Sequence, residues 1–426
     1  MGPEPVSVWV VPRFALRPHE RSARLTLRTA IVATYPPRHC GIAAFTHDLV
    51  RATGSPNVVA LHPPGAPALY PREVRHRIRR DVAADYGRTA ASLADDGVEL
   101  VSIQHEYGIW GGDDGELVLD FVRALRMPVV ATLHTVRRTP TPSQHRILAR
   151  LCDAVDGVVV MSHAAATLLA RVYGVSPTRI SVIPHGVPDL PRVDPELVKP
   201  RLGLAGRAVI LSFGLIGPGK GYELAIAALP EMVAAVPNAL YVILGATHPD
   251  LLLREGEAYR NGLVARASEL GVGDHVRFVD RFVTQAELGR WLQAADVFVT
   301  PYPGLEQIVS GTLSYAVGAG KAVVSTPYEY AVELLADERG ILVPPASPHA
   351  LASACVDLLV DATRRELLGA RAYRFGRHMV WSEVGAAYQR LFERVGRPER
   401  VGWSDPIVGP RPRPLVQPLP SSQLDA

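Results

Sequence analysis

Short apolar runs alternate with longer amphipathic stretches along almost the whole chain, and this alternation limits the possible folds more than any other feature. The apolar runs lie at residues 29–34, 58–61, 100–103, 129–133, 157–161, 208–213, 240–245, 276–279, 296–300 and 321–326. Runs of this length are typical of parallel strands buried on both faces, and the stretches between them are long enough for crossover helices. The pattern therefore predicts an α/β fold with parallel sheets.

Helical periodicity fills most of the intervals between the apolar runs. We expect helices at residues 42–53, 73–93, 116–125, 148–155, 162–173, 222–236, 252–270, 284–294 and 381–394, and further helices after residue 348. The helix that follows Thr312 ends at a Gly-Ala-Gly step, which is a common way for a helix to stop.

A proline-rich segment near residues 187–200 divides the alternation into two serial halves. Because 426 residues exceed one ordinary core, we expect two Rossmann-like domains that face each other across a cleft. The expected parts are an N-terminal extension (1–27), a first domain (28–192), a second domain (193–380), a C-terminal helix that crosses back to the first domain (381–400) and an unpacked proline-rich tail (401–426).

Composition excludes several classes of function. The 45 basic residues nearly balance the 42 acidic residues, so nucleic acid is not an expected partner, although peripheral contact with an anionic membrane face remains open. The three cysteines have no metal or redox spacing, which favours reduced thiols and a cytoplasmic location. No apolar run reaches about 18 residues, so no membrane-spanning helix is expected.

The segment 296–326 is the strongest candidate for a binding site. It predicts a strand, a polar loop with Glu306 and Gln307, a helix that begins at Ser310, Gly311 and Thr312, and a second strand. The first N–H groups of a helix have no partner within the helix and bind anions well. We therefore expect this segment to hold the diphosphate and sugar of a nucleotide-sugar donor.

Two glycine-containing loops are further phosphate candidates. Gly41 follows the first strand, and Gly214 and Lys220 lie in the loop after the strand at 208–213. Lysine and backbone amides in such a loop suit a phosphate, although an ordinary loop glycine or a solvated lysine is the plainer explanation. Neither loop matches the dinucleotide or Walker A pattern.

Polar side chains also follow two predicted strands of the first half. His105 and Glu106 come directly after the run at 100–103, and His134 comes directly after the run at 129–133. Ligand contacts in α/β folds lie at these strand ends, and histidine can exchange a proton with a hydroxyl near neutral pH. A structural loop histidine is the alternative.

Four sequence elements, in the order in which they occur along the chain, resemble those of retaining glycosyltransferases of the GT-B fold, family 4 (group 1). They are Gly41, the segment 183–186, the loop 214–221 and the segment 296–324, and the resemblance covers about residues 28–395. It implies transfer of a hexosyl unit, with retention, from a UDP-, GDP- or ADP-sugar to a hydroxyl of a saccharide, glycan or lipid. It also implies that both glycine loops approach the donor diphosphate, that His134 contacts the donor sugar and that His185 lies near the cleft.

The chain departs from this family at two points. The family usually carries two glutamates with seven residues between them, whereas alignment on Gly320 places Gln307 and Tyr315 at these positions. Glu306 then lies beside the first position, and alignment on Glu306 instead does not restore the second acid. A basic residue often follows the glycine of the loop at 214, and Leu215 stands there, so Lys220 and an arginine such as Arg281 would compensate. These changes indicate either a divergent subfamily that binds the donor differently or an enzyme that has lost activity, and we favour an active, divergent transferase.

The expected mechanism needs neither metal nor cofactor. Lys220 and the amides at 310–312 would stabilise the leaving diphosphate, and His134 and Glu306 would hold sugar hydroxyls. Three other functions stay open: a GT-B sugar phosphorylase or nucleotide-sugar epimerase, a nicotinamide oxidoreductase, and a non-catalytic nucleotide-sugar binder.

Overall fold

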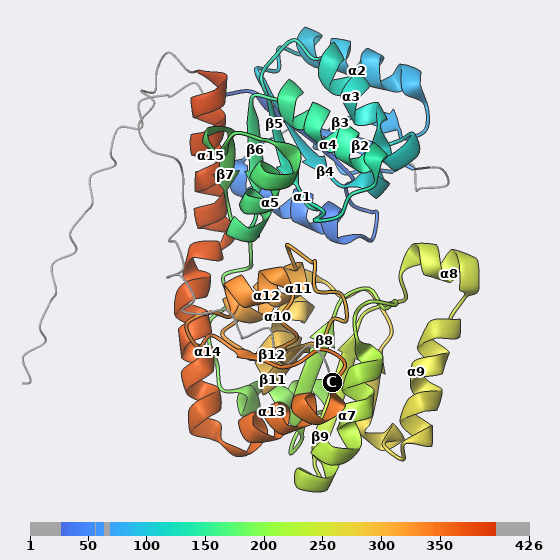
Figure 1. Cartoon of the computed structure of the whole chain (residues 1–426), viewed down its shortest axis with the longest axis vertical. Helices are drawn as coiled ribbons and strands as arrows, with labels where there is room; N and C mark the ends of the chain where they lie inside the picture. The colour runs from blue at the N-terminus through green and yellow to red at the C-terminus, as the bar shows by residue number, and fades with distance from the viewer. Residues whose placement is uncertain (1–26, 56, 64–68, 398–426) are drawn as a thin grey trace, which may run out of the picture.

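The computed structural model describes residues 27–55, 57–63 and 69–397, which form two α/β domains stacked along the long axis of the molecule (Figure 1). The extension up to residue 26 and the proline-rich tail lie outside the described residues. Each domain contains one parallel sheet with helices packed against it, as the alternation of apolar runs predicts.

The first sheet has seven strands in the order β3-β2-β1-β4-β5-β6-β7. Every residue of the central strand β1 is buried, because helices cover both faces of the sheet. The strands are β1 (Thr29–Ala33), β2 (Asn57–His62), β3 (Val74–Arg79), β4 (Leu100–His105), β5 (Val129–Leu133), β6 (Gly157–Val160) and β7 (Ile180–Val182).

The second sheet has six strands in the order β10-β9-β8-β11-β12-β13. Its strands are β8 (Ala208–Phe213), β9 (Ala239–Leu244), β10 (Val276–Val279), β11 (Val297–Thr300), β12 (Ala322–Ser325) and β13 (Ile341–Leu342). In both sheets the strand order reverses next to the first strand, between β1 and β4 and between β8 and β11. Ligands of doubly wound sheets bind at such switch points, at the carboxyl ends of the strands.

Helices account for most of the remaining described residues. Those of the first domain are α1 (Gly41–Thr53), α2 (Ala83–Asp95), α3 (Leu117–Ala124), α4 (Pro142–Ala154) and α5 (His163–Tyr173). Those that follow are α6 (Pro195–Val198), α7 (Tyr222–Ala235), α8 (Pro249–Glu255), α9 (Ala258–Glu269), α10 (Gln285–Ala294), α11 (Gly311–Gly318), α12 (Glu329–Leu334), α13 (Pro348–Val360), α14 (Ala362–Gly376) and α15 (Trp381–Gly396).

The helix expected at residues 73–93 is wrong in about its first half. Residues Val74–Arg79 form the edge strand β3, and the helix α2 begins only at Ala83. In β3 only Ile78 is buried, while Arg75, Arg77 and Arg79 are exposed. An edge strand with one solvated face lacks the continuous apolar run by which buried strands are recognised, and charged side chains protect its open edge.

Two other helix predictions differ from the structure. The single helix expected at 252–270 is two helices, α8 and α9, because the chain turns at Gly256 with a φ of 60°. The helix expected at 148–155 begins earlier, at Pro142. There Thr141 and Gln144 form a reciprocal capping box that satisfies the first N–H groups of α4.

The chain passes between the domains twice, and the two crossings lie side by side. Val187 on the outgoing strand donates to the carbonyl of Met379 (2.8 Å), and Trp381 on the returning strand donates to the carbonyl of Val187 (3.0 Å). After the second crossing α15 packs along α1 of the first domain (Figure 1). The hydroxyl groups of Tyr388 on α15 and Thr132 on β5 lie 3.1 Å apart.

Candidate functional site

The amino end of α11 lies at the switch point of the second sheet, directly after β11 and its loop. Ser310 caps this helix, and its Oγ accepts a hydrogen bond from the N–H of Leu313 (3.3 Å). Thr312 Oγ1 lies 2.8 Å from the hydroxyl of Tyr302 and 3.1 Å from Ser310 Oγ. The N–H groups of the first turn are thus surrounded by hydroxyls, an arrangement that favours an anion.

The glycine loop after β8 lies against this helix end. A Cβ built on Gly214 would lie 3.3 Å from the methyl group of Thr312, and the φ of Gly214 is +128°. Lys220 places its Nζ 4.7 Å from the ring centroid of Tyr302, whose hydroxyl contacts Thr312. Gly221 passes so close to Pro301 that a Cβ would lie 1.8 Å from the Pro301 carbonyl oxygen. Glycine therefore allows the approach that brings Lys220 toward α11.

His185, from the outgoing crossing, covers the start of α11. Its Nε2 lies 2.9 Å from the position of a Cβ on Gly311, so glycine is required there. Its Nδ1 donates to the carbonyl of Gly186 (2.8 Å). Burial lowers the pKa of His185 to about 4, so the ring is neutral at pH 7. Its Nε2 is therefore an acceptor that faces the amino end of α11.

His134 lies at the end of β5 in the first domain and contacts the same group of side chains. Its Nε2 donates to Gln104 Oε1 (2.9 Å), and its ring packs edge-on against Phe45 at a centroid distance of 5.0 Å. Phe45 also packs on His185, at 5.1 Å. Burial, together with the neighbouring His185 and His105, lowers the pKa of His134 to about 3. A neutral His134 leaves Nδ1 as a hydrogen-bond acceptor.

The polar residues at the end of β4 are less accessible. His105 is completely buried, and within the described part of the chain neither ring nitrogen has a hydrogen-bond partner. Burial lowers the pKa of His105 to about 4. Glu106 accepts from the backbone N–H of Tyr107 (3.0 Å) and from the hydroxyl of Thr135, so both of its carboxylate oxygens are engaged locally.

The other predicted contacts are placed differently. Glu306 is exposed in the loop before α11, 3.4 Å from Thr139 Oγ1 of the first domain. Gln307 donates to the carbonyl of Val309 (2.9 Å) and thereby shapes this loop. The exposed Arg281 is paired with Glu287 (2.9 Å), so it does not replace the missing loop cation in this arrangement.

Gly41 begins α1, and no described atom lies within 4 Å of a Cβ built there. The cap of this helix is Cys40, whose Sγ accepts from the N–H of Ala43 (3.3 Å). The structure therefore brings together Gly214, Lys220, the residues 310–312, His185 and His134, and it places Gly41 at the head of the helix that carries Phe45.

Sequence reasoning missed three residues of this region: Tyr302, Gln104 and Asp48. Asp48 lies on α1 and accepts from Gln285 Nε2 (2.9 Å) and from the hydroxyl of Tyr315 (3.4 Å). A carboxylate on the apolar face of a helix was a signal available in the sequence, because Asp48 follows Phe45 by three residues. Gln104 and Tyr302 carried no comparable signal.

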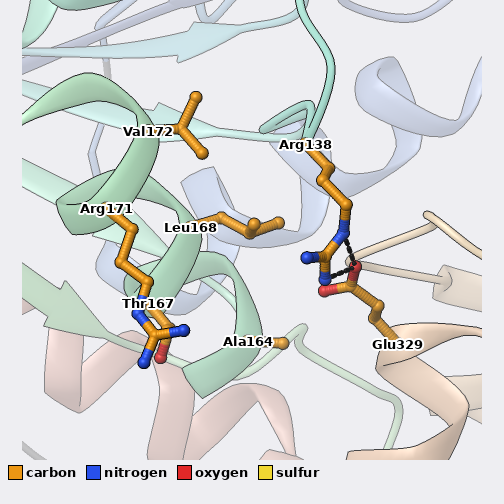
Figure 2. Close-up of a pocket in the computed structure, with 7 residues that line it drawn as sticks. All are labelled: Arg138, Ala164, Thr167, Leu168, Arg171, Val172 and Glu329. Carbon is orange, nitrogen blue, oxygen red and sulfur yellow. Dashed lines mark hydrogen bonds and ion pairs between the residues drawn. The ribbon is translucent and has the colours of Figure 1, made fainter.

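Two recesses lie near the site. Figure 2 shows one between α5 and α12, where Arg138 of the first domain donates to Glu329 of the second (3.0 Å). The other recess adjoins the glycine loop and α8, and it is lined by Leu215, Gly217, Pro218, Lys220, His248, Asp250, Leu251, Arg254 and Glu255. Within residues 27–55, 57–63 and 69–397, no three His, Cys, Asp or Glu side chains gather in a way that could hold a metal ion.

Among the described helices, none is both long enough and apolar enough to cross a bilayer.

Comparison with known proteins identifies both domains. Residues 39–189 match the family model described as Glycosyltransferase Family 4, and residues 207–361 match the one described as Glycosyl transferases group 1. A D-inositol 3-phosphate glycosyltransferase of Xylanimonas cellulosilytica is 31% identical over 300 residues, which are 63% of this chain and 67% of that protein. A D-inositol 3-phosphate glycosyltransferase 2 of Catenulispora acidiphila is 27% identical over 288 residues, 63% of this chain and 65% of that protein.

The match to the Catenulispora acidiphila protein thus spans slightly less than two thirds of its length. Among solved structures, Anabaena HepE in complex with UDP has a TM-score of 0.70 at 15% identity, covering 86% of this chain and 100% of that chain. Sucrose-phosphate synthase of Thermosynechococcus elongatus has a TM-score of 0.70 at 17% identity, covering 86% and 98%. These similarities and the two facing parallel-sheet domains show that the chain belongs to glycosyltransferase family 4 (group 1) and has the GT-B fold.

Proposed function

We propose that this protein is a retaining glycosyltransferase that moves a hexosyl unit from a nucleotide-diphosphate sugar to a hydroxyl acceptor. The observation that supports the proposal best is the meeting of three features at the cleft. Lys220 and the amino end of α11 come from the second domain, and His134 faces them from the first domain through Phe45 and His185.

The second domain would bind the donor diphosphate. The N–H groups of Gly311 and Thr312 and the ammonium of Lys220 supply positive potential where the leaving phosphate gains charge. The close packing of Gly214 and Gly221 holds these groups in place before the donor arrives, which reduces the reorganisation needed in the transition state.

The first domain would hold the sugar. His134 is neutral at pH 7, so it acts as a hydrogen-bond partner of a hydroxyl and not as a proton donor. From the second domain, the exposed Glu306 on the loop before α11 would accept a hydrogen bond from a second sugar hydroxyl, beside its contact with Thr139. The leaving phosphate would accept the proton of the acceptor hydroxyl on the same face of the sugar, which gives retention without a carboxylate nucleophile.

The relatives narrow the choice of substrates. HepE was solved with UDP and with UDP-glucose, and a Mycolicibacterium smegmatis relative is named as GDP-mannose-dependent. Other relatives are named for D-inositol 3-phosphate or phosphatidyl-myo-inositol. We propose a UDP- or GDP-sugar as donor, with ADP-sugars as the third candidates, and a saccharide, glycan or inositol-containing lipid as acceptor.

Thermal unfolding with UDP-, GDP- and ADP-sugars tests the donor assignment. A donor at 100 times its Kd stabilises the folded state by about 2.7 kcal/mol, which raises the Tm measurably. Release of the nucleoside diphosphate should then require an acceptor hydroxyl, and NMR of the product should show the anomeric configuration of the donor. Stabilisation without transfer or donor hydrolysis would favour a non-catalytic binder, and sugar phosphate release that depends on inorganic phosphate would favour a phosphorylase.

We also propose peripheral contact with an anionic membrane on the cytoplasmic side, through the outer face of β3. Arg75 and Arg77 are exposed there along one edge of the first sheet, beside Arg79, which is paired with Asp85. The fraction of the protein that sediments with phosphatidylglycerol vesicles should fall steeply as the salt concentration rises. Equal sedimentation with neutral phosphatidylcholine vesicles would contradict this role.

A further inference from the structure

Asp48 is a buried carboxylate that the proposed reaction does not use. It lies in the second half of α1, with 9% of its surface exposed. Apart from its neighbour His47 (3.2 Å), its partners come from the other domain: Gln285 Nε2 at 2.9 Å and the Tyr315 hydroxyl at 3.4 Å. The partners stand 237 and 267 residues away in sequence.

A carboxylate at this position is costly unless it receives hydrogen bonds. Burial raises the pKa of Asp48, while the bonds from His47 and Tyr315 lower it in part. Since Gln285 begins α10 and Tyr315 lies within α11, both interdomain donors belong to the second domain. The carboxylate therefore keeps its two interdomain hydrogen bonds only while the domains are docked as in this structure.

Through Tyr315, Asp48 is connected to the amino end of α11. We call residues 310–312, where the donor diphosphate is proposed to bind, the donor seat. Tyr315 lies about one turn beyond Thr312 on α11, and its ring is 6.1 Å from that of His185. His185 covers Gly311 at the amino end of the same helix. On the other side, Phe45 precedes Asp48 by one turn on α1 and packs on both His185 and His134.

We propose that Asp48 is a positioning residue for the transfer reaction. Its carboxylate accepts hydrogen bonds from Tyr315 and Gln285 across the cleft, an interdomain contact that we call the clasp, and thereby holds the cleft closed. Closing draws α1 toward α11, so that Phe45 and His134 come against the donor seat. A second interdomain contact joins α12 to α5, where Glu333 accepts hydrogen bonds from the N–H groups of His163 and Ala164 (2.9 and 3.0 Å). The catalytic part of this inference rests on the proposed function, whereas the clasp itself does not.

Two measurements on Asp48→Ala test the clasp. Small-angle X-ray scattering should show a larger radius of gyration for the variant than for the native chain, because the domains are no longer held by α1. With the best donor and acceptor, kcat/KM should fall about 10- to 100-fold, as expected when a charge-assisted hydrogen bond is lost. Asp48→Asn keeps one oxygen acceptor, so its radius of gyration and its kcat/KM should lie between those of the native chain and those of Asp48→Ala. The matched control is Asp95→Asn, an exposed carboxylate at the end of α2, which should leave both quantities unchanged.

A double-mutant cycle separates clasping from general instability. If Asp48 acts through Tyr315, then Asp48→Ala and Tyr315→Phe together should cost little more than Asp48→Ala alone. Additive effects, or native scattering and native kcat/KM in Asp48→Ala, would overturn the clasp. A larger radius of gyration of Asp48→Ala with an unchanged kcat/KM would refute the positioning role but not the clasp. If the native chain transfers no sugar, the proposed function fails, and the scattering comparison still decides whether Asp48 holds the domains together.

Discussion

The buried His105 predicts a specific loss of stability in acid. Its ring is completely buried and, among the described residues, has no hydrogen-bond partner, so burial lowers its pKa from 6.5 to about 4. Between these values the unfolded chain binds a proton that the folded chain does not, so the free energy of unfolding decreases as the pH falls. The stability contributed by a neutral His105 is present above pH 6.5 and is lost toward pH 4.

The magnitude follows from the two pKa values. At pH 5.0 the unfolded state gains about 2 kcal/mol from protonation of His105, and at pH 7.5 it gains almost nothing. Urea unfolding of the native chain and of His105→Phe should be measured at both pH values, since phenylalanine keeps the ring but cannot titrate. His134 and His185 shift in the same direction in both proteins, and His105 is the smallest of the causes that lower the pKa of His134, so the difference between the two proteins comes mainly from His105.

The variant should therefore lose about 2 kcal/mol less than the native chain when the pH falls from 7.5 to 5.0. An identical pH dependence in both proteins would show that His105 is protonated in the folded state, and hence that it has a partner or access to water. The change in the urea m-value is a control, because a shift there would indicate altered compactness and not proton linkage.

Four further outcomes are expected. Lys220→Ala should lower turnover by roughly 100-fold through loss of one preorganised charge, and near-native turnover would remove Lys220 from the site. Transfer should persist in excess EDTA, since Lys220 and the α11 amides supply the positive potential; loss of activity that a divalent ion restores would contradict this. Gly221→Ala should destabilise far more than Gly219→Ala, because both have positive φ but only a Cβ at 221 meets a carbonyl oxygen, at 1.8 Å; equal urea midpoints would refute it. Glu333→Ala should cost about 1 kcal/mol in urea unfolding, because the N–H groups of His163 and Ala164 at the start of α5 lose their carboxylate partner, and an unchanged midpoint would show that water replaces it.

The sequence located most strands correctly because they are buried on both faces. β1, β6 and β11 consist of uninterrupted apolar or small residues, and the helices after β6 and β11 begin at the caps Ser162 and Ser310. β3 escaped detection because it is an edge strand with a single buried side chain, Ile78. Local pattern therefore identifies an element where both faces are buried, and it fails where solvent covers one face.

The candidate site divides in the same way. The amino end of α11 and the glycine loop were predictable, because helix caps, glycines and a lysine are local features of the chain. The roles of Gln307 and Arg281 were not, since their partners Val309 and Glu287 depend on loop geometry. Whether Gln307, Tyr315 or Glu306 contacts a donor stays a prediction.

The sequence by itself determined that this chain forms two parallel α/β domains and that a helix begins at Ser310, because period, capping and glycine placement act over a few residues. Only the tertiary structure decided how the domains face each other. Asp48, Tyr315 and Gln285 meet through hydrogen bonds of 2.9 and 3.4 Å that span more than half the chain, and such contacts exist only once both cores have packed and docked.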